Sequence, residues 1–146
     1  MINKELLKVL SIFSLIAGAI LGVLPLIPAL TGIAFFLLLF IISPFILIYF
    51  KHIKIIEDYN MEKCLIIGAI SGAIACVGFT LIYFPIAFIL QLIFEINSFI
   101  WIKVLFSNIG FIIPMVFFTS IISAISNTFS AFLIAYYFEF IKQNKQ

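Results

Sequence analysis

Four long apolar stretches, separated by short polar or proline-containing segments, run through the whole chain. They cover about residues 6–24, 30–50, 64–85 and 114–138. Each is long enough for a helix to cross a bilayer, which takes about 20 apolar residues. A chain in hydrocarbon must satisfy its own backbone hydrogen bonds, and a helix does so within one segment. The pattern therefore predicts an all-α fold, a polytopic membrane four-helix bundle in which residues 1–146 form a single transmembrane domain.

Small side chains recur at every fourth position in three of the four spans, and positions four apart share one face of a helix. In lipid, helices associate by close packing at such small-xxx-small positions. We predict that the first-span ridge faces the third-span ridge. The third-span ridge is Cys64, Gly68, Gly72, Cys76 and Thr80, the first-span ridge is Ser14, Gly18 and Gly22, and the last-span ridge is Thr119, Ser123, Asn127, Ala131 and Ala135. The predicted helix-packing residues are Ser14, Gly18, Gly22, Gly68, Gly72 and Cys76.

The second span, residues 30–50, has no extended ridge of small residues. We therefore expect it to lie at the periphery of the bundle and to expose much of its Phe and Leu surface to lipid. Ser43-Pro44 predicts a kink, because proline lacks an amide donor and clashes with the preceding turn.

The most polar segment, residues 51–63, follows the second span. Asn60 is the expected N-cap of the third span, and Glu62 in the first turn complements the helix dipole. Tyr83-Phe84-Pro85 combines an interfacial aromatic residue with a helix breaker. We therefore expect the third span to end at about residue 85.

Residues 86–113 are largely apolar and do not fit a simple four-span arrangement. Gln91, Glu95 and Ser98 form one polar stripe, which is typical of a helix lying in the membrane interface. Trp101 suits that depth. A re-entrant hairpin is the alternative, and its irregular backbone would need shielding by protein or a water-filled cavity.

The lysines predict the orientation, because positive residues accumulate in short cytoplasmic loops. With four spans, only Lys103 falls on the outer side. Both termini are therefore expected in the cytoplasm, with the protein in the inner membrane of a bacterium as a multi-pass protein. A competing five-span arrangement divides the last stretch near Ser126-Asn127 and leaves a final run too short to cross comfortably. The lysines on the expected inner side are Lys4, Lys8, Lys51, Lys54, Lys63, Lys142 and Lys145.

The composition excludes an ordinary water-soluble domain, since 66% of the residues are hydrophobic and only 10% are charged. The net charge of +2 provides no basic patch of the density that nucleic acid requires. Cys64 and Cys76 are separated by about 18 Å along one helix, too far for a disulfide bond. They are therefore expected to be small packing residues.

Candidate chemistry is sparse. Transporters and pumps usually hold a carboxylate, His or Lys within the bilayer, and none is expected at mid-depth here. His52 adjoins lysines in a solvated loop without ligand spacing around it. Nucleophile-elbow, phosphate-loop and zinc-protease motifs are missing from the sequence. We expect no enzyme activity, no cofactor and no metal site.

The last span carries a polar cluster, with Thr119, Ser123, Asn127 and Thr128 as the candidate polar pathway. In the structural interpretation the hydroxyls bond back to their own helix, while Asn127 bonds to a neighbouring helix. In the functional interpretation the cluster lines a path for a small neutral solute or an anion at an oligomer axis.

Residues 14–80 carry a broader likeness. The run from Ala17-Gly18 through Gly22 to Pro25, the charged loop, and the Gly/Ala-rich run at 67–75 resemble those of uncharacterised bacterial four-pass membrane proteins of the domain-of-unknown-function type. The resemblance implies a fold without implying an activity.

The expected function is therefore that of a non-catalytic integral membrane protein, a structural or accessory subunit or an oligomer-forming bundle. Its expected partners are the lipid bilayer and a second copy or another membrane protein, contacted through residues 86–113. The alternatives are an oligomeric channel or passive transporter for a small solute, and a holin-like protein.

Overall fold

The computed structural model describes residues 4–56, 60–94 and 107–143, and the regular elements in these residues are all helical. Four helical stretches are long and apolar enough to cross a membrane: Lys4–Leu26, Pro28–His52, Met61–Phe94 and Ile112–Glu139. The all-α four-helix bundle expected from the apolar pattern is thereby confirmed.

The first two spans form a hairpin. Helix α1 (Lys4–Leu21) is followed by two short 3₁₀ turns, η1 (Leu24–Leu26) and η2 (Pro28–Leu30), each with a proline in its first two positions. Proline suits these positions because its missing N–H has no intrahelical partner at a helix start. The second span then comprises α2 (Thr31–Phe36), a π-helical turn η3 (Leu37–Ile41) and α3 (Ile42–His52).

The third and fourth spans are two much longer helices, α4 (Met61–Phe94) and α6 (Ile112–Gln143), with the 3₁₀ turn η5 (Ile109–Phe111) before α6. The side chain of Asn60 accepts the backbone N–H of Glu62 at 3.0 Å, so it caps α4 as expected. Helix α6 is continuous across Ser126-Asn127, which favours four spans over five.

Helix α4 does not end at Pro85 but continues to Phe94, unlike the expectation from the sequence. Proline removes one intrahelical hydrogen bond, whereas a helix that ends in hydrocarbon leaves up to four carbonyls without partners. Continuing the helix is the less costly solution. Gln91 lies on this continuation and is buried, with 8% of its surface exposed, so it does not face solvent as part of an interfacial stripe. The remaining stripe residues, Glu95 and Ser98, lie outside the described residues, as does Trp101.

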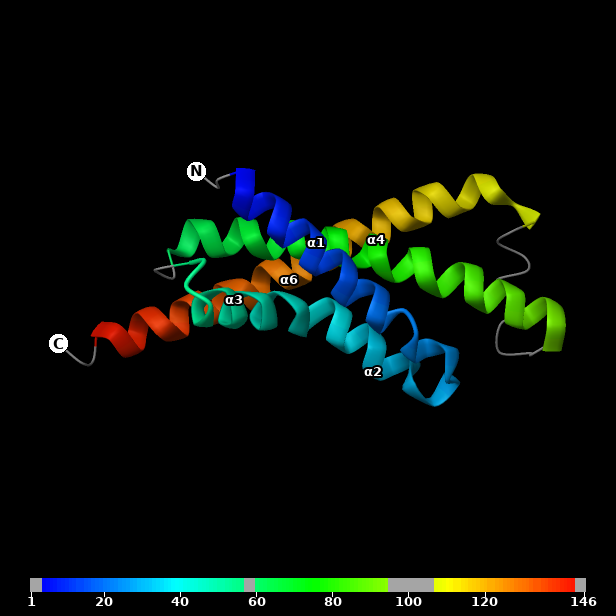
Figure 1. Ribbon diagram of the computed structural model, residues 1–146, viewed down its shortest axis with the longest axis horizontal. Coiled ribbons are helices and arrows are strands. Elements are labelled where there is room, and N and C mark those ends of the chain that lie inside the picture. The colour runs from blue at the N-terminus through cyan, green and yellow to red at the C-terminus, as the bar shows by residue number, and fades with distance from the viewer. Residues whose placement is uncertain (1–3, 57–59, 95–106, 144–146) are drawn as a thin grey trace.

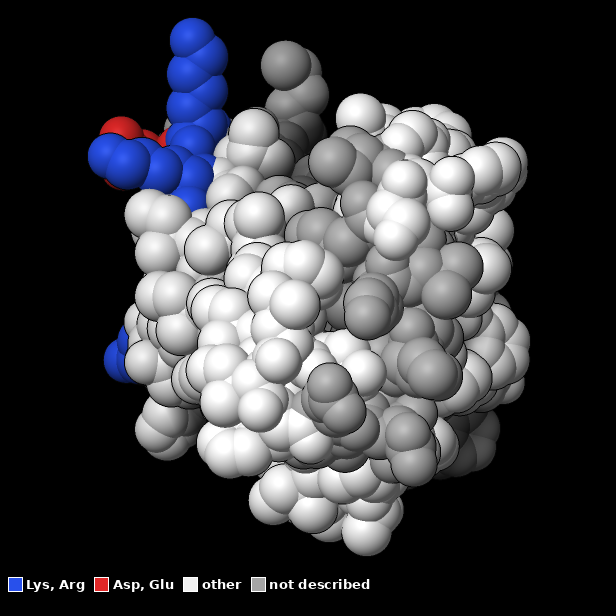
Figure 2. Space-filling view, turned by 90° about the vertical axis from the view of Figure 1, so that its right-hand side faces the viewer, with Lys and Arg blue, Asp and Glu red and all other residues white. Residues whose placement is uncertain are grey.

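Helix α4 lies at the centre of the fold, with α1 across one face and α6 across another (Figure 1). The start of α1, the loop after α3 and the end of α6 share one end of the molecule. The charged side chains of the described residues belong to that end. Figure 2 views the opposite end, where the described surface is almost free of Lys, Asp and Glu except at its rim.

The second span is more buried than a peripheral helix, which corrects the packing expected for residues 30–50. The expected exposure is confirmed for most of its phenylalanines, with Phe36 and Phe45 both 56% exposed, whereas its leucines are buried or half-buried. In its most apolar window 39% of the residues are buried, against 11% for the last span. The buried stripe runs at spacing four from Ala34 and then consists of larger side chains: Leu38, Ile42, Ile46 and Phe50. Ridges of small residues therefore identify close helix approaches, but a helix can also enter the core with large side chains.

Candidate functional site

A buried polar cluster joins the last span to the second and third spans. Its side chains are Ser43 on α3 and Ser123 and Asn127 on α6, each with 0% of its surface exposed. Polar groups buried this deeply in a membrane protein are costly unless they are hydrogen-bonded. The partners of each group therefore explain why the cluster is tolerated.

The second span departs from α-helical geometry just before Pro44. In a regular α-helix the proline ring would clash with the carbonyl of Phe40, four residues earlier, and the π-helical turn η3 covers this position. Asn127 packs against this turn through its side-chain amide. Its Oδ1 accepts the Ser43 N–H at 2.9 Å, and its Nδ2 donates to the Leu38 carbonyl at 2.8 Å. Leu38 and Ser43 are spaced like the two ends of a π-helical hydrogen bond, so the amide bridges this pair of backbone groups.

Further hydrogen bonds extend the cluster to α4. The Ser43 hydroxyl donates to the backbone carbonyl of Asn127 at 2.6 Å, and the Ser123 hydroxyl donates to the backbone carbonyl of Gly72 at 2.8 Å. Asn127 Nδ2 also donates to the Ser123 carbonyl at 3.0 Å. The cluster therefore links the second span, α4 and α6 by hydrogen bonds from fully buried side chains.

Glycines on α4 allow the close approach of α6 that these bonds require. A Cβ built on Gly72 would lie 2.5 Å from the Ser123 carbonyl oxygen, and one on Gly68 would lie 2.7 Å from the Ala131 Cβ. Real Cβ atoms essentially never come this close. One turn further on, Cys76 Sγ donates to Thr119 Oγ1 at 3.6 Å. The structure thus places Gly68, Gly72 and Cys76 against α6.

The small residues of α1 pack against a different face of α4. A Cβ on Gly18 would overlap the backbone of Ala75, and one on Gly22 would lie 2.7 Å from the Phe79 carbonyl oxygen. Gly78 of α4 in turn faces the backbone of Leu15. The first-span ridge therefore does not face Gly68 and Gly72, because α4 carries a second strip of small residues for α1.

The four candidate pathway residues divide into two kinds. Thr119 and Thr128 are half-buried and bond back to their own helix, donating to the carbonyls of Met115 and Ala124 at 2.9 and 2.7 Å. Ser123 and Asn127 are fully buried and bond to neighbouring spans. The sequence interpretation anticipated the behaviour of the threonines and of Asn127, but not the bond from Ser123 to α4.

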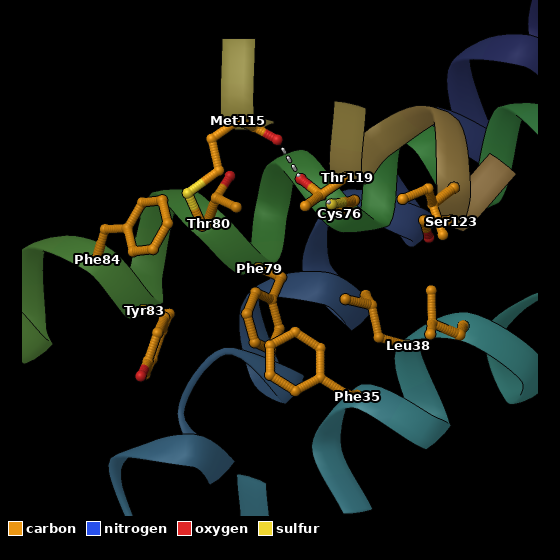
Figure 3. Close-up of a pocket in the computed structure, with 12 residues that line it drawn as sticks. Phe35, Leu38, Cys76, Phe79, Thr80, Tyr83, Phe84, Met115, Thr119 and Ser123 are labelled. Carbon is orange, nitrogen blue, oxygen red and sulfur yellow. Dashed lines mark hydrogen bonds between the residues drawn. The ribbon is translucent and has the colours of Figure 1, made fainter. Parts of the chain in front are cut away.

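An apolar cavity of about 160 Å³ adjoins the cluster between the second span, α4 and α6. Figure 3 shows the side chains that line the cavity: Phe35 and Leu38 from the second span, Phe79 from α4, and Met115 from α6. Leu38 and Ser123 belong both to the cavity wall and to the polar cluster. The cavity and the π-helical turn are therefore in direct contact.

Sequence reasoning missed the part played by Ser43 and by the backbone of Leu38. The signal that was present is a hydroxyl residue directly before a proline within an apolar span, Ser43-Pro44. A proline releases backbone groups, and a buried polar side chain elsewhere in the bundle is then the natural partner.

Titratable groups are not gathered at this site. Within residues 4–56, 60–94 and 107–143, no group of three or more His, Cys, Asp or Glu side chains lies together. Both cysteines are free and buried. No protein-family model matches the chain, and neither a curated protein nor a solved structure matches it.

Proposed function

We propose that this protein is a non-catalytic integral membrane protein that serves as a structural or accessory subunit, or as an oligomer-forming bundle. The observation that supports this role is the pair of long helix ends that continue past the first hairpin, residues 86–94 of α4 and 112–118 of α6. We call this pair of helix ends the apolar fork.

The two helices are longer than a bilayer requires. Helix α4 has 34 residues and α6 has 32, so they extend about 51 and 48 Å at a rise of 1.5 Å per residue. The hydrocarbon core is about 30 Å thick. An average tilt of about 20° shortens their projection only slightly. Figure 1 shows both helices reaching past the turn of the first hairpin at the end away from the termini.

The apolar fork exposes several large hydrophobic side chains, although Ala87 and Gln91 on its α4 arm are buried. The exposed fractions are 58% for Leu92, 65% for Ile93 and Phe94, and 74% for Ile113. Apolar surface that leaves the hydrocarbon region costs about 25 cal/mol per Å² in contact with water. Another membrane protein, or a second copy of this chain, would cover this surface, and residues 86–113 are the proposed contact region.

Cysteine crosslinking in native membranes tests this role. Ile113→Cys places a thiol on the apolar fork, whereas Ile20→Cys places one on α1, which is similarly exposed at 64%. The native Cys64 and Cys76 are buried and leave a low background. We expect Ile113→Cys, and not Ile20→Cys, to give a discrete crosslinked species, and native mass spectrometry from nanodiscs to show the same assembly. A strictly monomeric protein with no crosslinked partner would contradict the proposal.

The proposed setting is the inner membrane of a bacterium, with both termini in the cytoplasm. The support is the charged end of the bundle, where the start of α1, the end of α6 and the lysine-containing end of α3 lie together. Fusions of alkaline phosphatase and of green fluorescent protein to the C-terminus distinguish the orientations. We expect fluorescence without phosphatase activity, and the reverse result would contradict this orientation.

One observation favours a channel or passive transporter as the second candidate. Thr128 lines an open groove of about 400 Å³ between α4 and α6, beside Ala69 and Ala124. In an oligomer this groove would provide a polar position on a path between copies. Solute flux into liposomes that falls in Thr128→Val, with the fold intact, would favour this candidate. Absent or unchanged flux would leave the structural role, and toxicity on induced expression would instead indicate a holin-like protein.

A further inference from the structure

The cavity beside the polar cluster has a mouth that faces the membrane. Its deep walls are almost inaccessible, with 2% of Leu38 and 3% of Phe79 exposed. At its rim, Phe35 on the second span and Ile122 on α6 are 44% and 54% exposed. Because both rim residues lie within membrane-spanning helices and are hydrophobic, the mouth opens sideways into the hydrocarbon region rather than towards water.

The polar atoms in the cavity wall are occupied by bonds within the protein. The Thr80 hydroxyl donates to the Val77 carbonyl at 2.9 Å, and the Thr119 hydroxyl donates to the Met115 carbonyl at 2.9 Å. The Ser123 hydroxyl donates to the Gly72 carbonyl at 2.8 Å. The Cys76 thiol donates to Thr119 Oγ1 at 3.6 Å. The rest of the wall is mainly aromatic and aliphatic carbon, including the Tyr83 ring, together with the thioether of Met115. A ligand therefore meets an apolar surface and has little to gain from a donor, an acceptor or a charge.

The size of the cavity limits what fits. At about 160 Å³ it resembles the engineered apolar cavity of about 150 Å³ in another protein that stays dry and binds benzene. Water would need two to four polar partners to be stable in such a space. The cavity thus accommodates a short hydrocarbon segment, and in a bilayer lipid chains supply such segments at high concentration.

We propose that this cavity is a lateral binding site for a segment of a lipid acyl chain, which enters between Phe35 and Ile122. The bound segment contacts Leu38, whose carbonyl accepts from Asn127, and so fills the space beside the π-helical turn. Met115 suits this role because its flexible, polarizable side chain adapts to chains of different shape. Of the residues in the cavity wall, Met115 also belongs to the apolar fork, but the site does not depend on the identity of a protein partner.

Photolabelling in vesicles tests the site. The protein is placed in phosphatidylethanolamine and phosphatidylglycerol vesicles that contain a small fraction of phosphatidylcholine with a diazirine on one acyl chain. Labelled residues are then mapped by mass spectrometry. We expect Leu38 and Phe79 to be labelled as strongly as the lipid-exposed Leu81, while Ile46 and Ile67, which have 0% exposure and lie outside the cavity wall, stay unlabelled. Labelling of Leu38 and Phe79 no stronger than that of Ile67 would overturn the proposal.

Two matched variants at the rim test the entry path. Ile122→Trp enlarges a residue at the mouth, whereas Ile121→Trp changes its neighbour, which is 40% exposed and not part of the cavity wall. We expect Ile122→Trp to lower the labelling of Leu38 and Phe79 about tenfold, equivalent to about 1.4 kcal/mol of binding free energy, and Ile121→Trp to leave it unchanged. Circular dichroism of both variants verifies the fold. Equal labelling in the two variants, or labelling of Leu38 and Phe79 by a water-soluble diazirine instead, would overturn the site as proposed.

Discussion

The two faces of α4 show two ways of holding helices together in a membrane. Towards α1, the contact is made by backbone against backbone at Gly18, Ala75 and Gly78. The hydroxyls beside this contact bond within their own helices: Ser14 donates to the Leu10 carbonyl, and Ser71 donates to the Gly68 carbonyl. Towards α6, glycines again allow a close approach, but the hydroxyl of Ser123 crosses to the Gly72 carbonyl.

This difference teaches that small residues set the distance between helices, while polar groups set the register. Dispersion between close backbones falls off rapidly with separation but changes little with small sliding movements. A hydrogen bond has a defined donor and acceptor, so it fixes one relative position. The α6 face, with the Asn127 amide linked to the π-helical turn, is therefore expected to be the more specific of the two.

The largest effect is expected from Gly68→Leu combined with Gly72→Leu. Leucine at these positions would collide with the α6 backbone and push α6 away from α4. The hydrogen bonds of the polar cluster would then break. We expect loss of the folded bundle, because each overpacked site costs about 1–3 kcal/mol or more. Unfolding in mixed detergent micelles, followed by circular dichroism, measures the loss. The matched control is Gly32→Leu with Gly110→Leu, since a Cβ at either glycine meets no atom within 4 Å. Retention of the bundle in the Gly68 and Gly72 variant would contradict the account.

Asn127→Leu is expected to rank second. It removes a side-chain partner from both the Ser43 N–H and the Leu38 carbonyl. At about 1–2 kcal/mol for each buried group, the free energy of unfolding should fall by about 3 kcal/mol. Ser130→Ala is the control, because the Ser130 hydroxyl bonds only to the Ser126 carbonyl of its own helix. A similar small change in both variants would mean that the amide bridge contributes little.

Gly18→Ala tests the α1 face. The added methyl group meets the Ala75 backbone, which cannot rotate away as a side chain can. We expect a loss of about 2 kcal/mol, within the usual range for overpacking. Ile20→Ala, at an exposed position of the same helix, should change the unfolding free energy much less. A stable Gly18→Ala protein would show that α1 can shift freely along α4.

The smallest predicted effect is that of Ser123→Ala, and its comparison with Ser71→Ala distinguishes the α6-facing side of α4 from its α1-facing side. Ser123→Ala removes a hydrogen bond between helices, for which the average contribution in a membrane is about 0.6 kcal/mol. Ser71→Ala removes only a bond within α4 and should have an effect close to zero. Paired unfolding measurements give the difference. A larger loss for Ser71→Ala would reverse the assignment of specificity to the α6 face.

The sequence was sufficient for the features that depend on one helix at a time. Span number follows from apolar length, and the Asn60 cap follows from local chemistry. The back-bonded threonines of α6 follow from the same local chemistry.

Features that depend on pairs of helices were harder to predict. Spacing shows that Gly18 and Gly72 lie on ridges, but it does not show which ridge meets which, since α4 has small residues on two faces. The buried stripe of residues 30–50 left no periodic signal in the sequence, because nearly every side chain in that span is apolar. The bridge from Asn127 to Leu38 and Ser43 depends on a π-helical turn that only the packed bundle reveals.

Two single-methyl substitutions test the central claim, that close backbone approach at α4 organises this bundle. Alanine normally favours a helix over glycine by about 1 kcal/mol, so Gly32→Ala, with open space around its new Cβ, should leave the protein as stable or more stable. Gly72→Ala adds the same methyl group 2.5 Å from the Ser123 carbonyl oxygen and should destabilise it. The account predicts opposite signs for the two changes in unfolding free energy. A Gly72→Ala protein at least as stable as Gly32→Ala would contradict it.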